Sequence, residues 1–132
     1  MRNSIKISAV IPTFNREKTV GRAIESALAQ EFPVSEIIVV DDDGSKDGTR
    51  KIVESYGVKC RYICQENAGV SAARNRGVRE AGHDWIVFLD SDDYWFPQHL
   101  LRLADAVEAT NGEAALYFCD IRRPSGEGGF SH

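Results

Sequence analysis

Apolar residues along the chain are concentrated in short runs, and each run ends in a polar or glycine-containing segment. Five runs predict β-strands, at residues 5–11, 37–40, 61–64, 85–89 and 114–118. The second and fourth runs are apolar throughout, which is typical of strands that are covered on both faces. The segments between them place apolar residues at helical spacing. The first such segment holds Val20, Ala23, Ile24, Ala27 and Leu28.

This alternation predicts the fold class. Helices between buried strands favour an α/β, Rossmann-like, mostly parallel sheet with helices on both faces. Asn15 and Asp47 are candidate helix caps, and Pro97 is expected to open the last helix. No linker interrupts the pattern, so we expect one domain over residues 1–121. Residues 122–132 predict a turn-rich or disordered tail.

Composition excludes several classes of protein. Of 132 residues, 42% are hydrophobic and the net charge is −4, so disorder of the whole chain is excluded. The acidic balance does not favour nucleic-acid binding, and no apolar run reaches the roughly 18 residues of a membrane span. The N-terminus has no secretory signal pattern, which predicts a cytoplasmic protein, with peripheral association at the inner face of the membrane as an alternative. The odd number of cysteines, 3, predicts thiols rather than a disulfide framework.

Acidic residues follow two of the predicted strands, at residues 41–43 and 90–93. The carboxyl ends of parallel strands meet at one edge of a sheet, together with residues 12–15 after the first strand. Converging carboxylates repel one another unless a cation lies between them. Oxygen ligands of this kind suit Mg²⁺ or Mn²⁺ that shares a substrate diphosphate. Solvated turn and capping acids are the alternative interpretation.

Four segments resemble the motifs of glycosyltransferase family 2, in that family's order and spacing. They are residues 9–16 (AVIPTFNR), 37–49 (IIVVDDDGSKDGT), 67–77 (NAGVSAARNRG) and 88–93 (FLDSDD). The resemblance covers residues 5 to about 103 and implies the GT-A fold, a nucleotide-diphosphate sugar donor and transfer with inversion to an acceptor hydroxyl. At family level it suggests bacterial polysaccharide or envelope assembly, with a saccharide, a lipid-linked molecule or a protein as acceptor.

The resemblance also implies roles for individual residues. Pro12, Thr13 and Phe14 would form the nucleotide pocket, with Phe14 stacked on the base. An acid before Gly44 would accept a hydrogen bond from the base. The family pattern has two aspartates there and this chain has three, so counting from the strand selects Asp42 and counting back from the glycine selects Asp43.

The segment Asp90-Ser91-Asp92 resembles the family's Asp-x-Asp motif. Asp92 would bind the metal that bridges the diphosphate, and Asp90 would lie near the metal and the ribose or sugar. Arg74 would pair with an acid or a phosphate, and Gly69 would permit a tight loop beside the donor. A solvent-exposed helical arginine is the alternative for Arg74.

The family's catalytic base lies well beyond the Asp-x-Asp motif, and neither Asp120 nor Glu127 matches its position. We therefore expect a donor-binding half without the base, as a truncated chain or a naturally short protein. A non-catalytic nucleotide-sugar-binding module is one alternative. A haloacid-dehalogenase-like phosphatase with Asp41 as nucleophile is another. An EF-hand over residues 43–54 is disfavoured, because a strand and not a helix precedes it.

Overall fold

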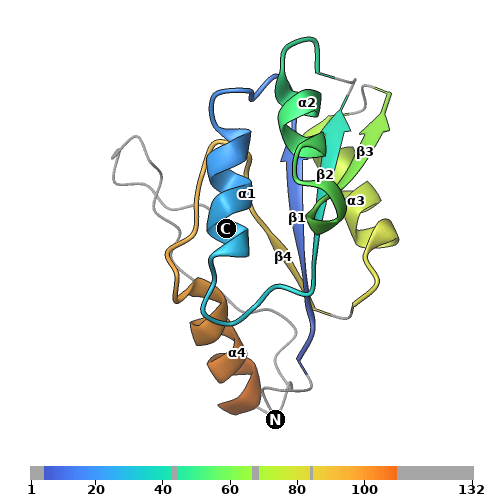
Figure 1. Ribbon diagram of the computed structural model, residues 1–132. Helices are drawn as coiled ribbons and strands as arrows, with labels where there is room; N and C mark the ends of the chain where they lie inside the picture. The colour runs from blue at the N-terminus through green and yellow to red at the C-terminus, as the bar shows by residue number, and fades with distance from the viewer. Residues whose placement is uncertain (1–4, 43–44, 67–68, 84, 110–132) are drawn as a thin grey trace.

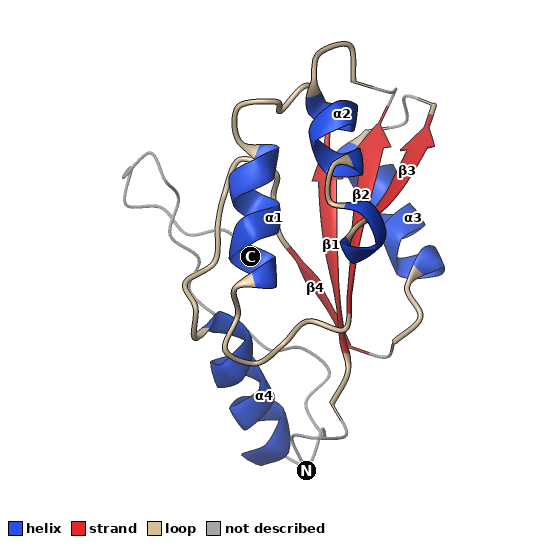
Figure 2. Cartoon of the chain, in the orientation of Figure 1, coloured by secondary structure: helices blue, strands red, loops and turns tan. Residues whose placement is uncertain are grey.

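The computed structural model describes residues 5–42, 45–66, 69–83 and 85–109. Within them, β1 (Ile7–Thr13), β2 (Glu36–Asp42), β3 (Arg61–Gln65) and β4 (Trp85–Phe88) form one sheet. Its strand order is β3-β2-β1-β4, and every pair is parallel (Figures 1 and 2). The predicted strand at 114–118 and the predicted tail at 122–132 lie outside the described residues.

The sheet order creates a switch point between β1 and β4. The chain adds β2 and then β3 on one side of β1, and then returns to the other side for β4. The loops after β1 and after β4 are therefore neighbours at the carboxyl edge, and the crevice there lies at a topological switch point. Ligands of open α/β sheets bind in such a crevice.

Helices cover both faces of the sheet, as the alternation predicts. The elements are α1 (Val20–Leu28), α2 (Thr49–Glu54), α3 (Val70–Glu80) and α4 (His99–Ala109), with a 3₁₀ turn at Gly57–Lys59. In Figure 1, α1 and α2 lie in front of the sheet and α3 lies behind it. One cluster of buried side chains joins β1 and β2 to α1 and α4. A smaller cluster on the other face holds Ile38, Val40, Ile63 and Ala73.

Helix α3 packs unusually close to the sheet. A Cβ added at Gly77 would lie 2.2 Å from Cγ1 of Val10, so only a glycine fits against β1 at this position.

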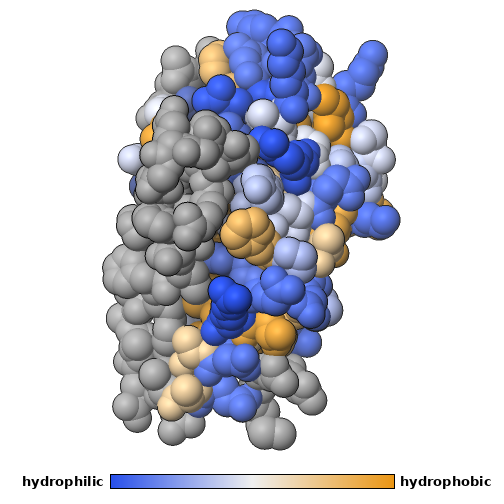
Figure 3. All heavy atoms as spheres, turned by 90° about the vertical axis from the view of Figure 1, so that its left-hand side faces the viewer, coloured by the Kyte–Doolittle hydropathy of each residue, from blue (hydrophilic) through white to orange (hydrophobic). Residues whose placement is uncertain are grey.

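The surface shown in Figure 3 is mostly hydrophilic among the described residues, and its apolar groups lie in separate small patches. No described helix combines the length and the apolar character that a membrane span requires.

Strand β1 continues through Pro12 and Thr13, so the prediction that the first strand ends at residue 11 is wrong. Leu89 N donates to Val10 O at 2.9 Å, which shows that the polar groups of Val10 face β4. Pro12, two residues on, has its nitrogen on the same side, where β4 has already ended at Phe88. A proline is tolerated there because no ladder hydrogen bond needs its missing N–H.

Two helix starts also differ from prediction. Helix α1 begins at Val20 with Thr19 at the N-cap, and Asn15 lies in a left-handed conformation at φ +50° instead of capping it. Helix α4 begins at His99, two residues after Pro97. Asp47 does act near a helix start, because its Oδ1 accepts from the backbone N of Thr49, the first residue of α2, at 3.0 Å.

The cysteine prediction is confirmed for the described residues. Cys60 is buried, Cys64 is exposed, and both are free thiols. Burial raises the pKa of the Cys60 thiol to about 12, so Cys60 stays protonated and inert.

Candidate functional site

A pocket of about 350 Å³ opens at the carboxyl edge of the sheet, where chain order predicts a common site. It receives residues from the ends of β1 and β2, from the first two turns of α3 and from the loop after β4. Its lining consists of Pro12, Thr13, Phe14, Arg16, Asp42, Val70, Ala73, Arg74, Asp90, Ser91 and Asp92.

Most of the site residues predicted from the sequence line this pocket. Gly69 is the exception among the described ones: it precedes α3 at φ +93° and donates its backbone N–H to Asp42 Oδ2 at 3.2 Å. It therefore supports a lining residue without lining the pocket itself. Asp43 lies outside the described residues, so of the two candidates for the base-reading acid only Asp42 is placed, and it lines the pocket.

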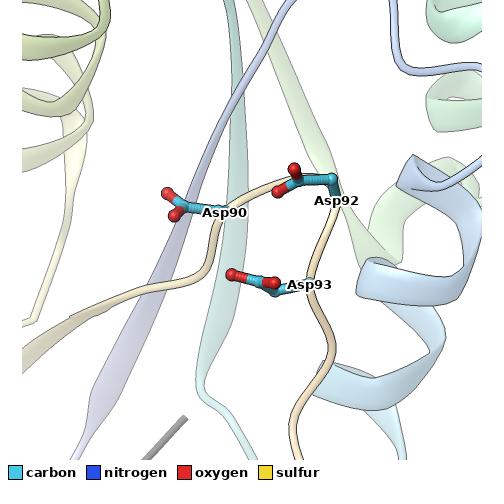
Figure 4. A group of neighbouring side chains, drawn as sticks. All are labelled: Asp90, Asp92 and Asp93. Carbon is cyan, nitrogen blue, oxygen red and sulfur yellow. The ribbon is translucent and has the colours of Figure 1, made fainter. Parts of the chain in front are cut away.

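Three carboxylates gather in the loop after β4. One oxygen from each of Asp90, Asp92 and Asp93 lies within 4.8 Å of the others, and Figure 4 shows the three side chains on one bend of the chain. A backbone hydrogen bond of 3.0 Å from Asp93 N to Asp90 O closes this bend. Asp93 is buried, whereas Asp90 and Asp92 are half-buried and reach the pocket. A set of oxygen ligands with access to a cavity fits Mg²⁺ or Mn²⁺.

Arg74 connects α3 to this acidic loop. Its Nη2 donates to Asp90 Oδ1 at 3.0 Å, and its guanidinium lies 5.8 Å from the ring centroid of Phe88. The sequence offered a carboxylate or a phosphate as its partner, and the structure shows the carboxylate. The guanidinium also compensates part of the negative charge beside Asp92.

Two buried polar atoms of the pocket residues have no hydrogen-bond partner among the described residues. They are Oγ1 of Thr13 and Nε of Arg74. Buried polar groups are almost always paired, so unpaired ones in a cavity indicate hydrogen bonds that a ligand or water completes. One of these atoms lies at the end of β1 and the other lies on α3.

Phe14 and Val70 form an apolar rim on the pocket. Phe14 is 42% exposed, which excludes core packing as the reason for an aromatic residue at this position. Val70, at the start of α3, is 54% exposed. A flat aromatic ring at a polar pocket is suited to stacking against a planar ligand group.

The two acids that end β2 differ in their surroundings: Asp42 lines the pocket, whereas Asp41 has no exposed surface. Asp41 Oδ1 accepts hydrogen bonds from the N and Oγ of Ser45 at 3.0 and 2.8 Å. Its Oδ2 accepts from Tyr62 Oη at 2.6 Å. Burial and this hydrogen bond raise the pKa of Tyr62. A buried and fully bonded carboxylate is not available as a phosphatase nucleophile, so the structure gives no support to that alternative for Asp41.

The EF-hand alternative also fails on geometry. Strand β2, and not a helix, precedes residues 43–54. Glu54, which would be the last calcium ligand, is paired with Arg50 on the surface of α2 at 3.3 Å.

Sequence reasoning missed two arginines of the site. Arg16 lines the pocket and belongs to the segment 9–16 that carries the family resemblance, so its motif was a usable signal. Arg22 on α1 donates to the backbone O of Asp92 at 3.4 Å and lies over the ring of Tyr94. No local pattern marks Arg22, because the contact joins residues that are 70 positions apart.

Comparison with known proteins identifies the family. The family model described as glycosyl transferase family 2 matches residues 8–131. An uncharacterised glycosyltransferase of Rickettsia typhi is 34% identical over 113 residues, which is 86% of this chain and 35% of that protein.

Solved structures agree with this relationship. Staphylococcus aureus TarS 1-349 in complex with UDP-GlcNAc has a TM-score of 0.71 and 33% identity, over 81% of this chain and 32% of that one. Mycobacterium tuberculosis glucosyl-3-phosphoglycerate synthase, in complex with Mn²⁺, UDP and phosphoglyceric acid, has a TM-score of 0.68 and 27% identity, over 80% of this chain and 40% of that one. The chain thus spans about a third of the length of such relatives, and it belongs to glycosyltransferase family 2, with the GT-A fold.

Proposed function

We propose that the pocket binds a nucleotide-diphosphate sugar together with Mn²⁺ or Mg²⁺, as the donor site of an inverting glycosyltransferase. One observation carries the proposal: a stacking surface with an adjacent acid, after β1 and β2, and two carboxylates of the acidic cluster, after β4, line the same pocket. A nucleotide sugar needs both, one for its base and one for its diphosphate. The UDP-GlcNAc complex of TarS and the Mn²⁺–UDP complex of the synthase support UDP as the nucleotide to test first.

The base would occupy the end of the pocket formed by β1 and β2. There the ring of Phe14 offers a stacking surface, Asp42 offers an acceptor for a base N–H, and Oγ1 of Thr13 offers an unused hydroxyl. Pro12 lines the same end and has no N–H that would need a partner.

The diphosphate would occupy the other end. Asp92 and Asp90 would hold the divalent ion, which when bound acts as a Lewis acid on the leaving diphosphate. Arg74 orients Asp90 through their ion pair, and its Nε–H, which has no partner among the described residues, would donate to a phosphate oxygen. Ser91 is buried between the two acids and completes this wall, and Arg16 adds a second cation to the lining.

The acceptor hydroxyl, of a saccharide, a lipid-linked molecule or a protein, needs a general base within hydrogen-bond reach. The pocket acids among the described residues are all assigned to the donor, and Asp120 and Glu127 lie outside the described residues. We therefore assign no catalytic base. A chain that binds the donor without transferring it is the second candidate function, and a turnover assay distinguishes the two.

Isothermal titration calorimetry with UDP tests the donor site. We expect binding with Mn²⁺, loss of binding with EDTA, and an affinity at least about tenfold weaker for Asp92→Asn, equivalent to about 1.4 kcal/mol. Asp105→Asn is the matched control, because Asp105 is an exposed aspartate on α4 that does not line the pocket. Binding that is independent of metal and unchanged in Asp92→Asn would refute the site.

A further inference from the structure

The loops that follow β1 and β2 are joined by hydrogen bonds between residues about thirty positions apart. Asn15 N donates to Ser45 Oγ at 2.8 Å, and Lys46 N donates back to Asn15 Oδ1 at 2.7 Å. Three further hydrogen bonds, of 2.7 to 3.2 Å, join residues 16–17 to residues 47–49. Figure 1 shows both loops at the carboxyl edge of the sheet, above the ends of β1 and β2.

This contact between the loops is anchored inside the protein. The Ser45 hydroxyl that accepts from Asn15 donates to Asp41 Oδ1 at 2.8 Å. Asp41 in turn accepts from Tyr62 of β3 at 2.6 Å. One continuous set of hydrogen bonds, Tyr62–Asp41–Ser45–Asn15, therefore links β3 to the carboxyl ends of β2 and β1. We call it the loop network.

The loop network lies directly beside the two residues assigned to the base. Thr13 of β1 is in register with Asp41 of β2, and Phe14 and Asp42 are the residues that follow them. Asn15 follows Phe14, and Asp41 precedes Asp42. Whatever holds Asn15 against Ser45 thus sets the separation between the stacking ring and the acid.

The conformation of Asn15 supports this role. Its φ of +50° is left-handed, which costs free energy for most residues and least for asparagine and glycine. Its backbone N and its Oδ1 both bond to the other loop, in contacts that are exposed to solvent. Exposed hydrogen bonds contribute little net stability, so this pair of bonds fixes the position of Asn15 more than it stabilises the fold.

We propose that the loop network is a positioning device that sets the width of the nucleobase slot between Phe14 and Asp42. The inference rests on the proposed function and extends it: Ser45, Asn15, Asp41 and Tyr62 act through Phe14 and Asp42 and do not touch the donor. Loss of the Ser45 hydroxyl then impairs recognition of the base and spares recognition of the diphosphate.

Ser45→Ala removes both hydrogen bonds of the hydroxyl, and Ser45→Thr restores a hydroxyl. Ser8→Ala is the matched control, because Ser8 Oγ makes a similar bond to a carboxylate, with Glu36 Oε2 at 2.6 Å, at the opposite edge of the same strands. Each variant is titrated with UDP and with inorganic pyrophosphate in the presence of Mg²⁺, and its thermal stability is measured.

We expect Ser45→Ala to bind UDP about three- to tenfold more weakly, the range for loss of one or two hydrogen bonds. Pyrophosphate binding should be unchanged, and Ser45→Thr should recover most of the UDP affinity. Ser8→Ala should lower the melting temperature and leave both affinities unchanged.

Two results would overturn the inference. If the parent chain with Mg²⁺ binds UDP no more tightly than pyrophosphate, the uridine adds no affinity, and both the base slot and the proposed function fail. If the parent binds UDP more tightly than pyrophosphate and Ser45→Ala keeps that ratio, only the positioning role fails. The same holds if UDP and pyrophosphate affinities fall together, because the effect is then one of general stability.

Discussion

The amino edge of the sheet, where the strands begin, and the carboxyl edge, where they end, differ in the hydrogen bonding of their polar groups. At the amino edge, Glu36 Oε2 accepts hydrogen bonds of 2.6 Å from both Ser8 Oγ and Gly82 N. Nearby, Glu80 pairs with Arg76 and Arg61, whose hydrogen bonds lower the pKa of its carboxyl. Polar groups at this edge bond to one another.

The carboxyl edge of the same strands differs, although Asp41 there is hydrogen-bonded to Ser45 and Tyr62. Three carboxylates lie within 4.8 Å of one another, and Thr13 Oγ1 and Arg74 Nε have no partner among the described residues. The same strands form both edges, so the sheet itself does not explain why the hydrogen bonding at the two edges differs. The difference indicates that the amino edge contributes stability and that the carboxyl edge is arranged for a ligand, where local rules are broken for function.

The largest expected effect tests the amino edge. Glu36→Ala removes the acceptor of two charge-assisted hydrogen bonds and leaves the buried Ser8 hydroxyl unpaired, so we expect a loss of roughly 3 to 4 kcal/mol in the free energy of unfolding. Urea denaturation measures this loss, with the exposed Glu31→Ala as control. UDP affinity should not change, and a variant of full stability with impaired UDP binding would reverse the roles of the two edges.

The second effect concerns the loss of folding stability in acid, which we attribute to His99. His99 is buried and stacked on Trp95, and burial, with a smaller effect of Arg102, lowers its pKa to about 4. Because the unfolded chain takes up this proton at a higher pH, stability is full above pH 6.5 and falls as the pH drops from 6.5 towards 4.

Denaturation at pH 7 and pH 5 measures this linkage. The parent should lose about 2 kcal/mol more than His99→Phe, which keeps a ring against Trp95 but cannot titrate. Equal pH dependence of the two proteins would show that His99 is not the cause of the acid sensitivity.

The smallest effect sharpens the assignment of the carboxyl edge. Phe14→Ala should weaken UDP binding by at least about 1 kcal/mol, or fivefold, through loss of base stacking, without lowering stability by a similar amount. Phe96→Ala is the control, because Phe96 is 46% exposed, close to the 42% of Phe14, and does not line the pocket. If both variants bind UDP like the parent, the base does not stack on Phe14.

Much of the described fold was predictable because its signals are local. Short runs rich in apolar residues predicted β1 to β4, and helical spacing predicted the buried face of α1. The acids after β2 and β4 had to share an edge once the strands were parallel. Pro12 shows where this reasoning stopped: its place inside β1 depends on where the neighbouring strand ends, which its own neighbours in sequence do not reveal.

The sequence by itself determined the order of the elements, the family and the edge at which the acids meet. Hydrophobic periodicity, motifs and chain order can all be read along the linear sequence without knowledge of distant contacts. Only the tertiary structure decided which acid does what. Adjacent residues of a strand point in opposite directions, so Asp41 is buried against Tyr62 while Asp42 faces the pocket. The bonds that set these directions join residues about twenty to seventy positions apart, such as Asp41 with Tyr62, Asn15 with Ser45 and Arg22 with Asp92, and folding alone brings them together.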